Sequence, residues 1–541
     1  MLNPPVSLAL IALVAAFVYH KISQRRRNPL PPGPEKLPFI GNLLNMPTHF
    51  EWETYDKWCK ELDSEIIHLE VAGTSIVVMN SAEVAEDILD KHSAIHSNRP
   101  RLVMVNELMG WNYSFGLMEY GDEWRAQRRL FQQEFHPIAA ERFRPLETQV
   151  THAFLRHLVD DPKDFVPHIR HLAASTILGI AYGIDVLPEN DPYVAAAERA
   201  LESLGLGIAP GAFLVEALPL LKYVPDWFPG AGFKRKAKEW ARFSSVMREM
   251  PFRAAKESIS GSVTIFQANG TATSSFTSYS LEKLAESPER EFTDREEQEQ
   301  LIQSVAATMY TGATDSIMAV LSTFMLAMLA NPEAQKRAQA EIDSVVAPGE
   351  LPRFTDAPSL PFVSAIVKEC IRWKPVTPLG IPHASTSEDI YRGYRIPAGS
   401  IMVPNIWAML HDENMYPDSF SFKPERFIGS NGKLNPAVKD PETVIFGFGR
   451  RICPGRHMAW DSVWIAIASM LATLDISKAV DEHGNVIEPT YEYVSSLAWY
   501  VSLRNARQFA RDTLNFSIPA PFQCTIKPRS KAAEDIIRAV N

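Results

Sequence analysis

A ten-residue string near the end of the chain contains the residues best suited to chemistry. Positions 446–455 read Phe-Gly-Phe-Gly-Arg-Arg-Ile-Cys-Pro-Gly. The three glycines let the backbone approach a flat ligand closely and let amides point at the sulfur of Cys453. An amphipathic helix is predicted from residue 456 to about 474, with Pro454 in its first turn, and a helix N-terminus stabilises a thiolate. Such a thiolate can ligate iron; a buried structural cysteine is the alternative.

This string resembles the haem-binding loop of the cytochrome P450 family, the haem-thiolate monooxygenases. The family's Phe, Gly, Arg, Cys and Gly stand here at Phe446, Gly449, Arg451, Cys453 and Gly455. The resemblance implies haem b (iron protoporphyrin IX) as the cofactor, with the Cys453 thiolate as the iron ligand. It also implies the family's fold, which is mainly α-helical with small β-sheets.

Two further motifs of the family precede this loop, in the family's order. Residues 368–372 contain its Glu-x-x-Arg, and residues 424–427 read Pro-Glu-Arg-Phe. By resemblance, Glu369, Arg372 and Arg426 form a structural ion-pair network behind the haem. The spacing suits this role, because residues three apart share a helix face and two fork-shaped guanidiniums can bracket one carboxylate.

Trp124 and Arg128 are four residues apart and therefore share one face of a predicted helix. An indole N–H and a guanidinium can both donate to carboxylates, and in the family this pair binds the haem propionates. Arg451, Arg99 and His383 also match positions that commonly contact the propionates. For His383, an ordinary core or turn histidine is the alternative.

Arg125 and Arg129 lie about 100° around the same helix from Trp124 and Arg128. They can form a basic patch on the cysteine side of the haem, which suits docking of an acidic electron-transfer protein. By resemblance to eukaryotic microsomal members, that partner is an NADPH–cytochrome P450 reductase. An ordinary solvated face is the alternative. The implied reaction is R–H + O₂ + NADPH + H⁺ → R–OH + H₂O + NADP⁺.

A long apolar segment is expected to lie on the side of the haem opposite Cys453. A capping box that begins at Thr293 and a stop at Asn331-Pro332 predict one helix over residues 294–330. Residues 305–329 contain a single charge, Asp315, so a membrane span is the alternative. A span would separate motifs that must meet at one site. We therefore expect a buried central helix.

This helix departs from the family pattern Ala/Gly-Gly-x-Asp/Glu-Thr-Thr/Ser. Residues 311–316 read Thr-Gly-Ala-Thr-Asp-Ser, so the acid and the hydroxyl stand in reversed order. In the usual order the hydroxyl helps to deliver protons during oxygen activation, and the reversal moves a carboxyl towards that position. The residues assigned to catalysis are Gly312, Thr314, Asp315 and Ser316.

Two hypotheses follow from the reversed order. In the first, Asp315 with Thr314 and Ser316 forms a water-linked proton relay, and the protein is a working monooxygenase. In the second, the protein is an oxygen-independent isomerase or dehydratase, or a membrane-tethered haem protein that binds ligands without turnover. We favour the first, because a basic docking patch and a membrane anchor would have no use in an oxygen-independent catalyst.

The beginning of the chain is organised as an anchor followed by a stiff connection. Residues 6–19 are almost wholly apolar, and positive charges follow the run, which favours a signal anchor over a cleaved signal peptide. We expect a single transmembrane helix at 1–22, a basic and proline-rich hinge at 23–34 and a haem-thiolate catalytic domain at 35–541. Positive-inside bias and the resemblance predict a single-pass protein of the endoplasmic reticulum membrane with a cytosolic catalytic domain.

Composition excludes several other classes. The chain has 541 residues, a net charge of −10 and a pI of about 5.8, which argues against a nucleic-acid binder driven by overall charge. Its four cysteines contain no Cys-x-x-Cys pair, so neither a disulfide scaffold nor a zinc finger is supported.

The substrate is predicted to be a hydrophobic small molecule, such as a terpenoid or an aromatic metabolite. Residues 391–400 resemble fungal secondary-metabolism members of the family, and the segments that form the pocket walls by resemblance are mostly apolar. Residues 214–233 contain enough apolar and aromatic side chains to touch membrane lipid, with core packing as the alternative. The expected walls are residues 101–117, 204–215, 305–313, 376–381 and 495–497.

Overall fold

The computed structural model describes residues 28–209, 211–262, 275–286, 292–495 and 517–540. These residues form two compact units. Unit 1 contains the chain up to Pro100 together with Pro382–Asn405, and unit 2 contains Arg101–Ile381 with the chain from Ile406 onward. The predicted catalytic domain is thus divided between the two units. The predicted anchor at 1–22 and the first part of the hinge lie outside the described residues.

Unit 1 is built around a four-stranded sheet with the order β1-β2-β6-β3. Residues 65–80 alternate apolar and polar side chains around Gly73-Thr74, a pattern that predicts a β-hairpin. The hairpin is present: β1 and β2 pair antiparallel, with Ile66 opposite Met79. Ala72 and Gly73 have φ of 48° and 86°, so the glycine suits the tight turn. The elements are α2 (Glu51–Glu61), β1 (Ile66–Val71), β2 (Thr74–Met79), α3 (Ala82–Ala85), the π-helix η1 (Glu86–Lys91), α4 (Ser93–His96), β3 (His383–Ala384), β4 (Asp389–Tyr391), β5 (Tyr394–Ile396) and β6 (Ile401–Pro404).

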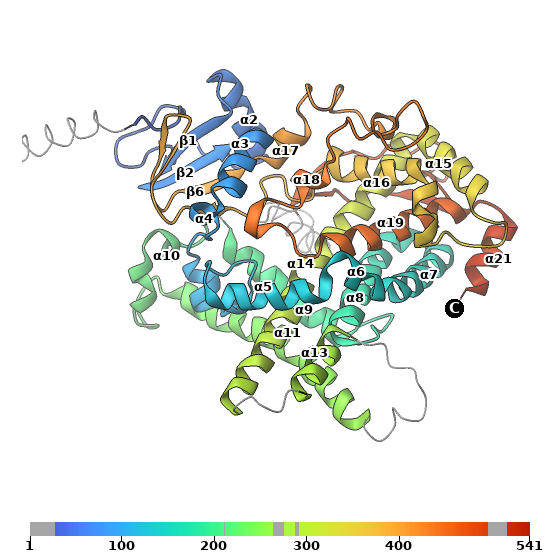
Figure 1. Cartoon of the computed structure of the whole chain (residues 1–541), viewed down its shortest axis with the longest axis horizontal. Helices are drawn as coiled ribbons and strands as arrows, with labels where there is room; N and C mark the ends of the chain where they lie inside the picture. Colours follow the sequence, from blue (N-terminus) through green and yellow to red (C-terminus); the bar gives the residue numbers. More distant parts are fainter. Residues whose placement is uncertain (1–27, 210, 263–274, 287–291, 496–516, 541) are drawn as a thin grey trace, which may run out of the picture. The chain divides into compact units, whose positions relative to one another are not determined.

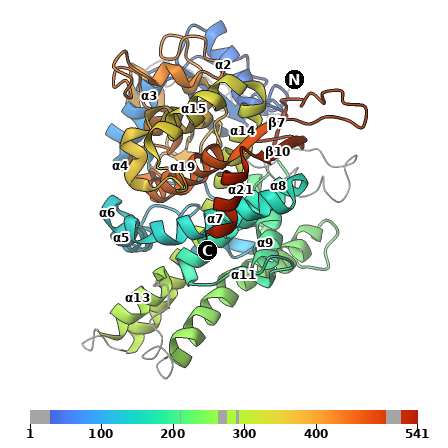
Figure 2. The ribbon, with the colours of Figure 1, turned by 90° about the vertical axis from the view of Figure 1, so that its right-hand side faces the viewer.

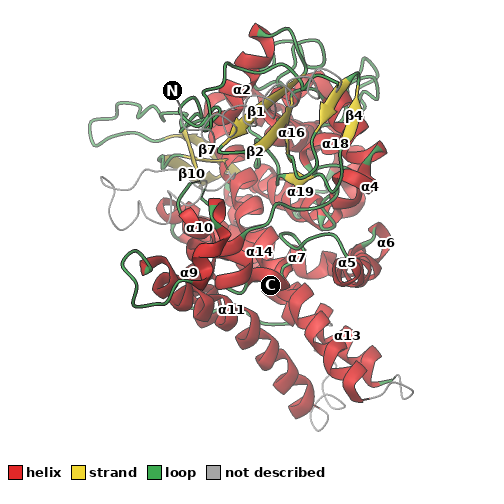
Figure 3. Ribbon diagram, turned by 90° about the vertical axis from the view of Figure 1, so that its left-hand side faces the viewer, coloured by secondary structure: helices red, strands yellow, loops and turns green. Residues whose placement is uncertain are grey.

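Unit 2 is mainly helical, with two small two-stranded sheets among its described residues (Figure 3). Its first half contains η2 (Val103–Leu108), η3 (Trp111–Tyr113), α5 (Asp122–Phe135), α6 (Pro137–Ala140), η4 (Glu141–Phe143), α7 (Arg144–Asp160), η5 (Pro162–Asp164), α8 (Phe165–Tyr182), α9 (Pro192–Ile208), α10 (Leu214–Ala217), η6 (Pro219–Tyr223), α11 (Gly232–Ser262) and α13 (Phe276–Ala285). Its second half contains α14 (Phe292–Ala330), α15 (Pro332–Val345), η7 (Phe354–Ser359), α16 (Pro361–Trp373), α17 (Ile406–Leu410), η8 (Pro424–Phe427), α18 (Glu442–Ile445), η9 (Gly449–Arg451), α19 (Arg456–Thr473), β7 (Leu474–Lys478), β8 (Tyr493–Ser495), β9 (Ser517–Pro519), β10 (Cys524–Pro528) and α21 (Lys531–Ala539).

The central helix of unit 2 is α14, which begins two residues before the predicted start and ends at the predicted Ala330. It contacts α5, α8, α13, α16 and α19, and it runs through the middle of these helices (Figure 1). Among the described helices it alone is long and apolar enough to cross a membrane, but 83% of its most apolar window is buried inside the protein. This burial agrees with the expected core helix.

The helix after the cysteine string, α19, packs on α7, which in turn contacts the C-terminal helix α21 (Figure 2). It begins at Arg456, as predicted, with Gly455 as its N-cap residue. Pro454 was expected in its first turn. Instead it lies in the turn before the helix, because the loop must first bring its own amides towards Cys453.

One predicted loop is shorter than the sequence indicates. The Gly/Ser/Thr-rich composition of residues 258–280 predicts a surface loop, but α11 continues to Ser262 and α13 begins at Phe276. The side chain of Ser275 caps α13 by accepting the amide of Ser278 at 3.1 Å. Local capping therefore extends helix into a composition that favours turns. Residues 263–274 lie outside the described part.

Candidate active site

The loop that precedes α19 folds tightly around Cys453. The Cys453 amide donates to the carbonyl of Phe446 at 2.7 Å, which closes the loop. Gly447 and Gly449 have φ of 77° and 54°, a region that favours glycine, so the predicted role of these glycines matches the backbone. The amide of Gly455 donates to the Cys453 sulfur and lowers its pKa, while burial, the larger effect, raises it.

The helix α5 places three side chains against this loop. Its Trp124 is buried, and the guanidinium of Arg451 lies 4.5 Å from the centre of the indole ring. A Cβ on Gly455 would lie 3.8 Å from the ring of Phe131, so α5 and the loop are in close contact. The positive charge of Arg128 acts on Cys453 and favours its thiolate form. The structure therefore brings Trp124, Arg128, Arg451 and Cys453 together from two distant parts of the sequence.

The electrostatics of this cluster suit an anionic ligand. Burial and the neighbouring charge of Arg128 lower the pKa of Arg451 to about 9. Burial also lowers the pKa of Arg128, and no described residue accepts a hydrogen bond from it or forms an ion pair with it. The Nε1 of Trp124 is likewise buried without a hydrogen-bond partner in the described chain. An unpaired indole N–H and two crowded guanidiniums beside a thiol fit the carboxylates and the iron of a haem.

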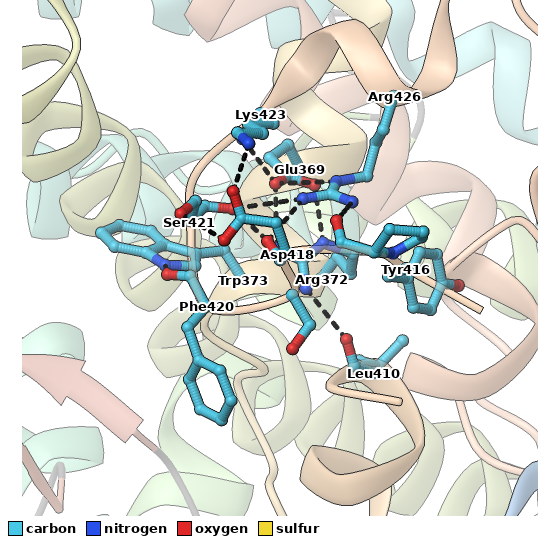
Figure 4. A network of polar contacts seen from close by, with 12 residues as sticks. Glu369, Arg372, Trp373, Leu410, Tyr416, Asp418, Phe420, Ser421, Lys423 and Arg426 are labelled. Carbon is cyan, nitrogen blue, oxygen red and sulfur yellow. Dashed lines mark hydrogen bonds and ion pairs between the residues drawn. The ribbon is translucent and has the colours of Figure 1, made fainter. Parts of the chain in front are cut away.

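Behind the loop, Glu369 on α16 is fully buried and bracketed by two guanidiniums (Figure 4). Arg372 Nε and Nη2 donate to its two oxygens at 2.7 and 2.9 Å, and Arg426 Nε donates to Oε1 at 3.2 Å. The backbone amide of Lys423 donates to the same oxygen at 2.7 Å. Further guanidinium N–H groups donate to the carbonyls of Leu410, Pro417, Asp418 and Ser421. The network fastens α16 to the segment that ends in the Pro-Glu-Arg-Phe motif.

Two of the expected propionate residues, Arg99 and His383, belong to unit 1. Both are buried. Arg99 Nη1 donates to the carbonyl of Pro382 at 2.9 Å, and His383 Nδ1 lies 2.8 Å from the carbonyl oxygen of His96. These bonds orient both side chains within unit 1.

In the middle of α14, the least buried residues are Thr311, Gly312, Ala313 and Ser316. Gly312 is exposed and Ser316 is half-buried, whereas the turns on both sides are buried. The Ser316 hydroxyl donates to the carbonyl of Gly312 at 3.0 Å. A Cβ on Gly312 would meet no atom within 4 Å. Two half-buried hydroxyls therefore flank Gly312 on α14, those of Thr311 and Ser316, and the Thr311 hydroxyl donates to the carbonyl of Ala307 at 3.0 Å.

Thr314 and Asp315 point into the protein instead. The Thr314 hydroxyl lies 3.4 Å from the carbonyl of Tyr310. Asp315 is buried, its Oδ1 has no hydrogen-bond partner among the described residues, and burial raises its pKa to about 6. The charge of Arg170 opposes this rise, and Arg170 Nη1 in turn pairs with Glu198 at 2.9 Å. Asp315 is thus an acid that can hold or release a proton near neutral pH.

Several residues of the site carry no signal in the local sequence. Arg170 on α8 and Glu198 on α9 approach Asp315 only because α8 and α9 contact α14. The carbonyls of Phe115 and Met118 accept from Arg451 at 3.0 and 2.8 Å. Tyr120 was detectable in principle: it precedes Trp124 by four residues, and their rings lie 4.8 Å apart.

The basic residues expected to receive an electron-transfer partner lie on the outer face of α5. Arg125 and Arg129 are exposed, and Arg125 pairs with Asp122. They border an open pocket that is also lined by Trp124, Arg128, Gln132, Gln133 and His136. The face is therefore basic and accessible in unit 2.

Comparisons with known proteins agree with this site. The family model described as cytochrome P450 matches residues 31–493. The chain is 45% identical to cytochrome P450 monooxygenase 98 of Postia placenta, over 98% of this chain and 96% of that one. It is 42% identical to cytochrome P450 monooxygenase ple1 of Rhodocybe pseudopiperita (98% and 96%) and 37% identical to tryptamine 4-monooxygenase of Psilocybe cyanescens (99% and 99%). With its cysteine loop, its buried Glu-Arg-Arg network and these relatives, the chain belongs to the cytochrome P450 family of monooxygenases.

Proposed function

We propose that the protein oxidises a hydrophobic small molecule, with O₂ as the oxidant and NADPH as the source of electrons. Electrons would reach it through an NADPH–cytochrome P450 reductase, and one oxygen atom would enter the substrate while the other leaves as water. The observation that carries the proposal is Cys453, held in a glycine loop beside Trp124, Arg128 and Arg451.

Each residue of the loop has a part in holding the cofactor. Cys453 would ligate the iron, and the Gly455 amide would stabilise its thiolate. Trp124, Arg128 and Arg451 of unit 2 would bind the propionates. For Arg99 and His383 the propionate role is proposed by resemblance alone. When bound, haem supplies the oxygen chemistry, and the protein positions the substrate and handles the protons.

Proton handling is assigned to α14. Asp315 has a pKa of about 6 and an unpartnered oxygen, so it can exchange a proton at neutral pH. Ser316 is the next residue along the helix, so its half-buried hydroxyl points about 100° away from Asp315. A water between the two side chains would complete a relay. This arrangement favours the monooxygenase hypothesis over an oxygen-independent catalyst, which needs no proton delivery to oxygen.

The substrate pocket is proposed to be apolar. Three of the five expected walls contribute buried side chains to a single hydrophobic cluster of unit 2: Val105 from residues 101–117, Leu204 from 204–215 and Val305 from 305–313. If the substrate binds beside this cluster, its walls are apolar and select apolar substrates, and a terpenoid or an aromatic metabolite is the proposed class. Residues 496–497 of the last wall lie outside the described part.

Membrane contact is proposed for the apolar stretch around η6. Leu214, Leu220 and Trp227 are 72%, 80% and 80% exposed, as expected for side chains that insert into lipid rather than into the core. The anchor at 1–22, a cytosolic catalytic domain and the endoplasmic reticulum remain part of the proposal.

The proposal is tested by spectroscopy and turnover of the full-length protein. Reduced protein with carbon monoxide should give a thiolate-type absorption band, which Cys453→Ser should abolish and Cys524→Ser, at another half-buried cysteine, should leave intact. In membranes that contain the reductase, substrate should accelerate NADPH consumption and yield an oxygenated product. A thiolate-type band that survives in Cys453→Ser would refute the ligand assignment. Product formation without NADPH or O₂ would instead favour the isomerase or dehydratase reading.

A further inference from the structure

Three side chains with metal-binding atoms meet in unit 1, and the proposed oxidation uses none of them. His92 Nδ1 lies 2.7 Å from Asp389 Oδ2, and His96 Nε2 lies 3.0 Å from the same oxygen. All three ligand atoms lie within 4.8 Å of one another, and this is the only group of its kind found among the described residues.

One helical turn and one strand carry the three side chains. His92 and His96 flank the single turn of α4, where the amide of His96 donates to the carbonyl of His92 at 3.3 Å. This four-residue spacing puts both imidazoles on one face. Asp389 begins β4, whose hairpin with β5 turns at Arg392 and Gly393, both with positive φ.

The carboxylate is held from several sides. Asp389 Oδ1 accepts the amide of Ile390 at 2.8 Å, which leaves Oδ2 directed at the imidazoles. The hairpin is fixed to η1 because the Tyr391 hydroxyl donates to Asp87 at 2.9 Å. Arg392 adds ion pairs to Glu65, at 2.8 Å, and to Glu83. Such outer contacts orient metal ligands in known sites.

The cluster is closed on one side and accessible on the other. The His96 side chain is fully buried and Asp389 is 12% exposed, whereas His92 is 41% exposed. An ion can therefore enter past His92, and water can complete its coordination sphere.

Two imidazole nitrogens and one carboxylate oxygen are a donor set that suits Zn²⁺. Bonds of about 2.0–2.1 Å to a tetrahedral ion place neighbouring ligand atoms roughly 3.3 Å apart. From the present 2.7 and 3.0 Å, the nitrogens of His92 and His96 must move away from Oδ2 by about 0.6 and 0.3 Å. The two nitrogens, now within 4.8 Å of each other, must also reach about 3.3 Å. Small side-chain rotations achieve this, since His92 is only partly packed.

We propose that His92 Nδ1, His96 Nε2 and Asp389 Oδ2 form a binding site for one Zn²⁺-type divalent ion. The ion links the two chain segments that make up unit 1, since the histidines come from the part before Pro100 and the aspartate from Pro382–Asn405. Joining residues so far apart in sequence removes much conformational freedom from the unfolded chain.

The test uses tag-free, haem-loaded full-length protein that has been treated with a chelator and dialysed against Zn²⁺. We expect one Zn²⁺ per chain and an X-ray absorption spectrum at the zinc edge with two imidazole ligands. His92→Ala and Asp389→Ala should each weaken Zn²⁺ binding by about 100-fold or more, because loss of even an outer-shell partner costs 10- to 100-fold. His483→Ala, an exposed histidine, is the matched control and should bind as the wild type does.

Correct folding of each variant is checked by its thiolate-type carbon monoxide band, and His92→Cys, which restores a ligand, should recover much of the affinity. The proposal is overturned if the wild type takes up no Zn²⁺, or if His92→Ala and Asp389→Ala bind it unchanged. In either case the three side chains form only a hydrogen-bonded cluster. Loss of uptake in His483→Ala would also contradict the assignment, since it would place the ion elsewhere.

Discussion

A buried acid between α7 and α19, the helix that follows Cys453, should make the stability of unit 2 depend on pH. Glu147 on α7 is 2% exposed and accepts a hydrogen bond from the Ser462 hydroxyl of α19 at 2.6 Å. Burial raises its pKa to about 8, and the nearby carboxylate of Asp461 adds to the rise. Glu147 is therefore protonated in the folded protein at neutral pH.

The sign and size of the effect follow from linkage. An unfolded glutamate releases its proton near pH 4.5, whereas the folded one keeps it to about pH 8. Between these values the folded state binds the extra proton, so the free energy of unfolding falls as the pH rises. At about 1.4 kcal/mol per pH unit, the loss amounts to roughly 3 kcal/mol at pH 7 and approaches 5 kcal/mol at pH 8.

Glu147→Gln tests this argument, because glutamine is neutral at every pH and its carbonyl can still accept from Ser462. Guanidinium unfolding of the full-length protein in detergent, followed by circular dichroism at pH 5, 6, 7 and 8, measures the dependence. We expect the variant to lose most of the fall in stability between pH 5 and 8. It should therefore exceed the wild type clearly at pH 8 and only slightly at pH 5.

The matched control is Glu282→Gln, at an exposed position on α13, which should leave the pH dependence unchanged. Equal slopes in the wild type and Glu147→Gln would refute the reasoning. A variant that is less stable than the wild type at pH 8 would show that the buried carboxyl stabilises the α7–α19 contact.

Three further outcomes are expected. Glu369→Gln should lower the free energy of unfolding by about 3–5 kcal/mol, because two buried guanidiniums lose their counter-charge. The variant should also lose most of its bound haem, as measured from the carbon monoxide band. Glu425→Gln, at a side chain that is 52% exposed, should lower the free energy of unfolding by less than about 1 kcal/mol. Trp124→Phe should speed haem transfer to apomyoglobin by about tenfold or more, because one hydrogen bond to a charged group is worth about 1.5–3 kcal/mol. An unchanged rate would mean that the indole N–H does not bind the cofactor. A fluorophore at Trp227→Cys should be quenched by brominated lipid in nanodiscs, and an unquenched signal would exclude insertion of this side chain.

The sequence alone determined the parts that depend on short, contiguous spacing. The cysteine string, the Glu-x-x-Arg pair and the pair Trp124 and Arg128 each lie within one loop or one helix, where periodicity decides which side chains face the same way. The hairpin around Gly73 and the central helix ending at Ala330 were predictable for the same reason. Their proposed chemistry came from the family resemblance, because a lone cysteine or a Glu-x-x-Arg pair has other common uses.

Only the tertiary structure decided how distant segments meet. The order of residues 311–316 suggests that Asp315 replaces a hydroxyl, but the packing of α8 and α9 on α14 buries Asp315 near Arg170 and leaves Ser316 half-buried. The cluster of His92, His96 and Asp389 was equally hidden, since nearly 300 residues separate its members. Helical and strand periodicity fix the direction of a side chain relative to its own element, whereas packing between elements fixes which neighbour it meets.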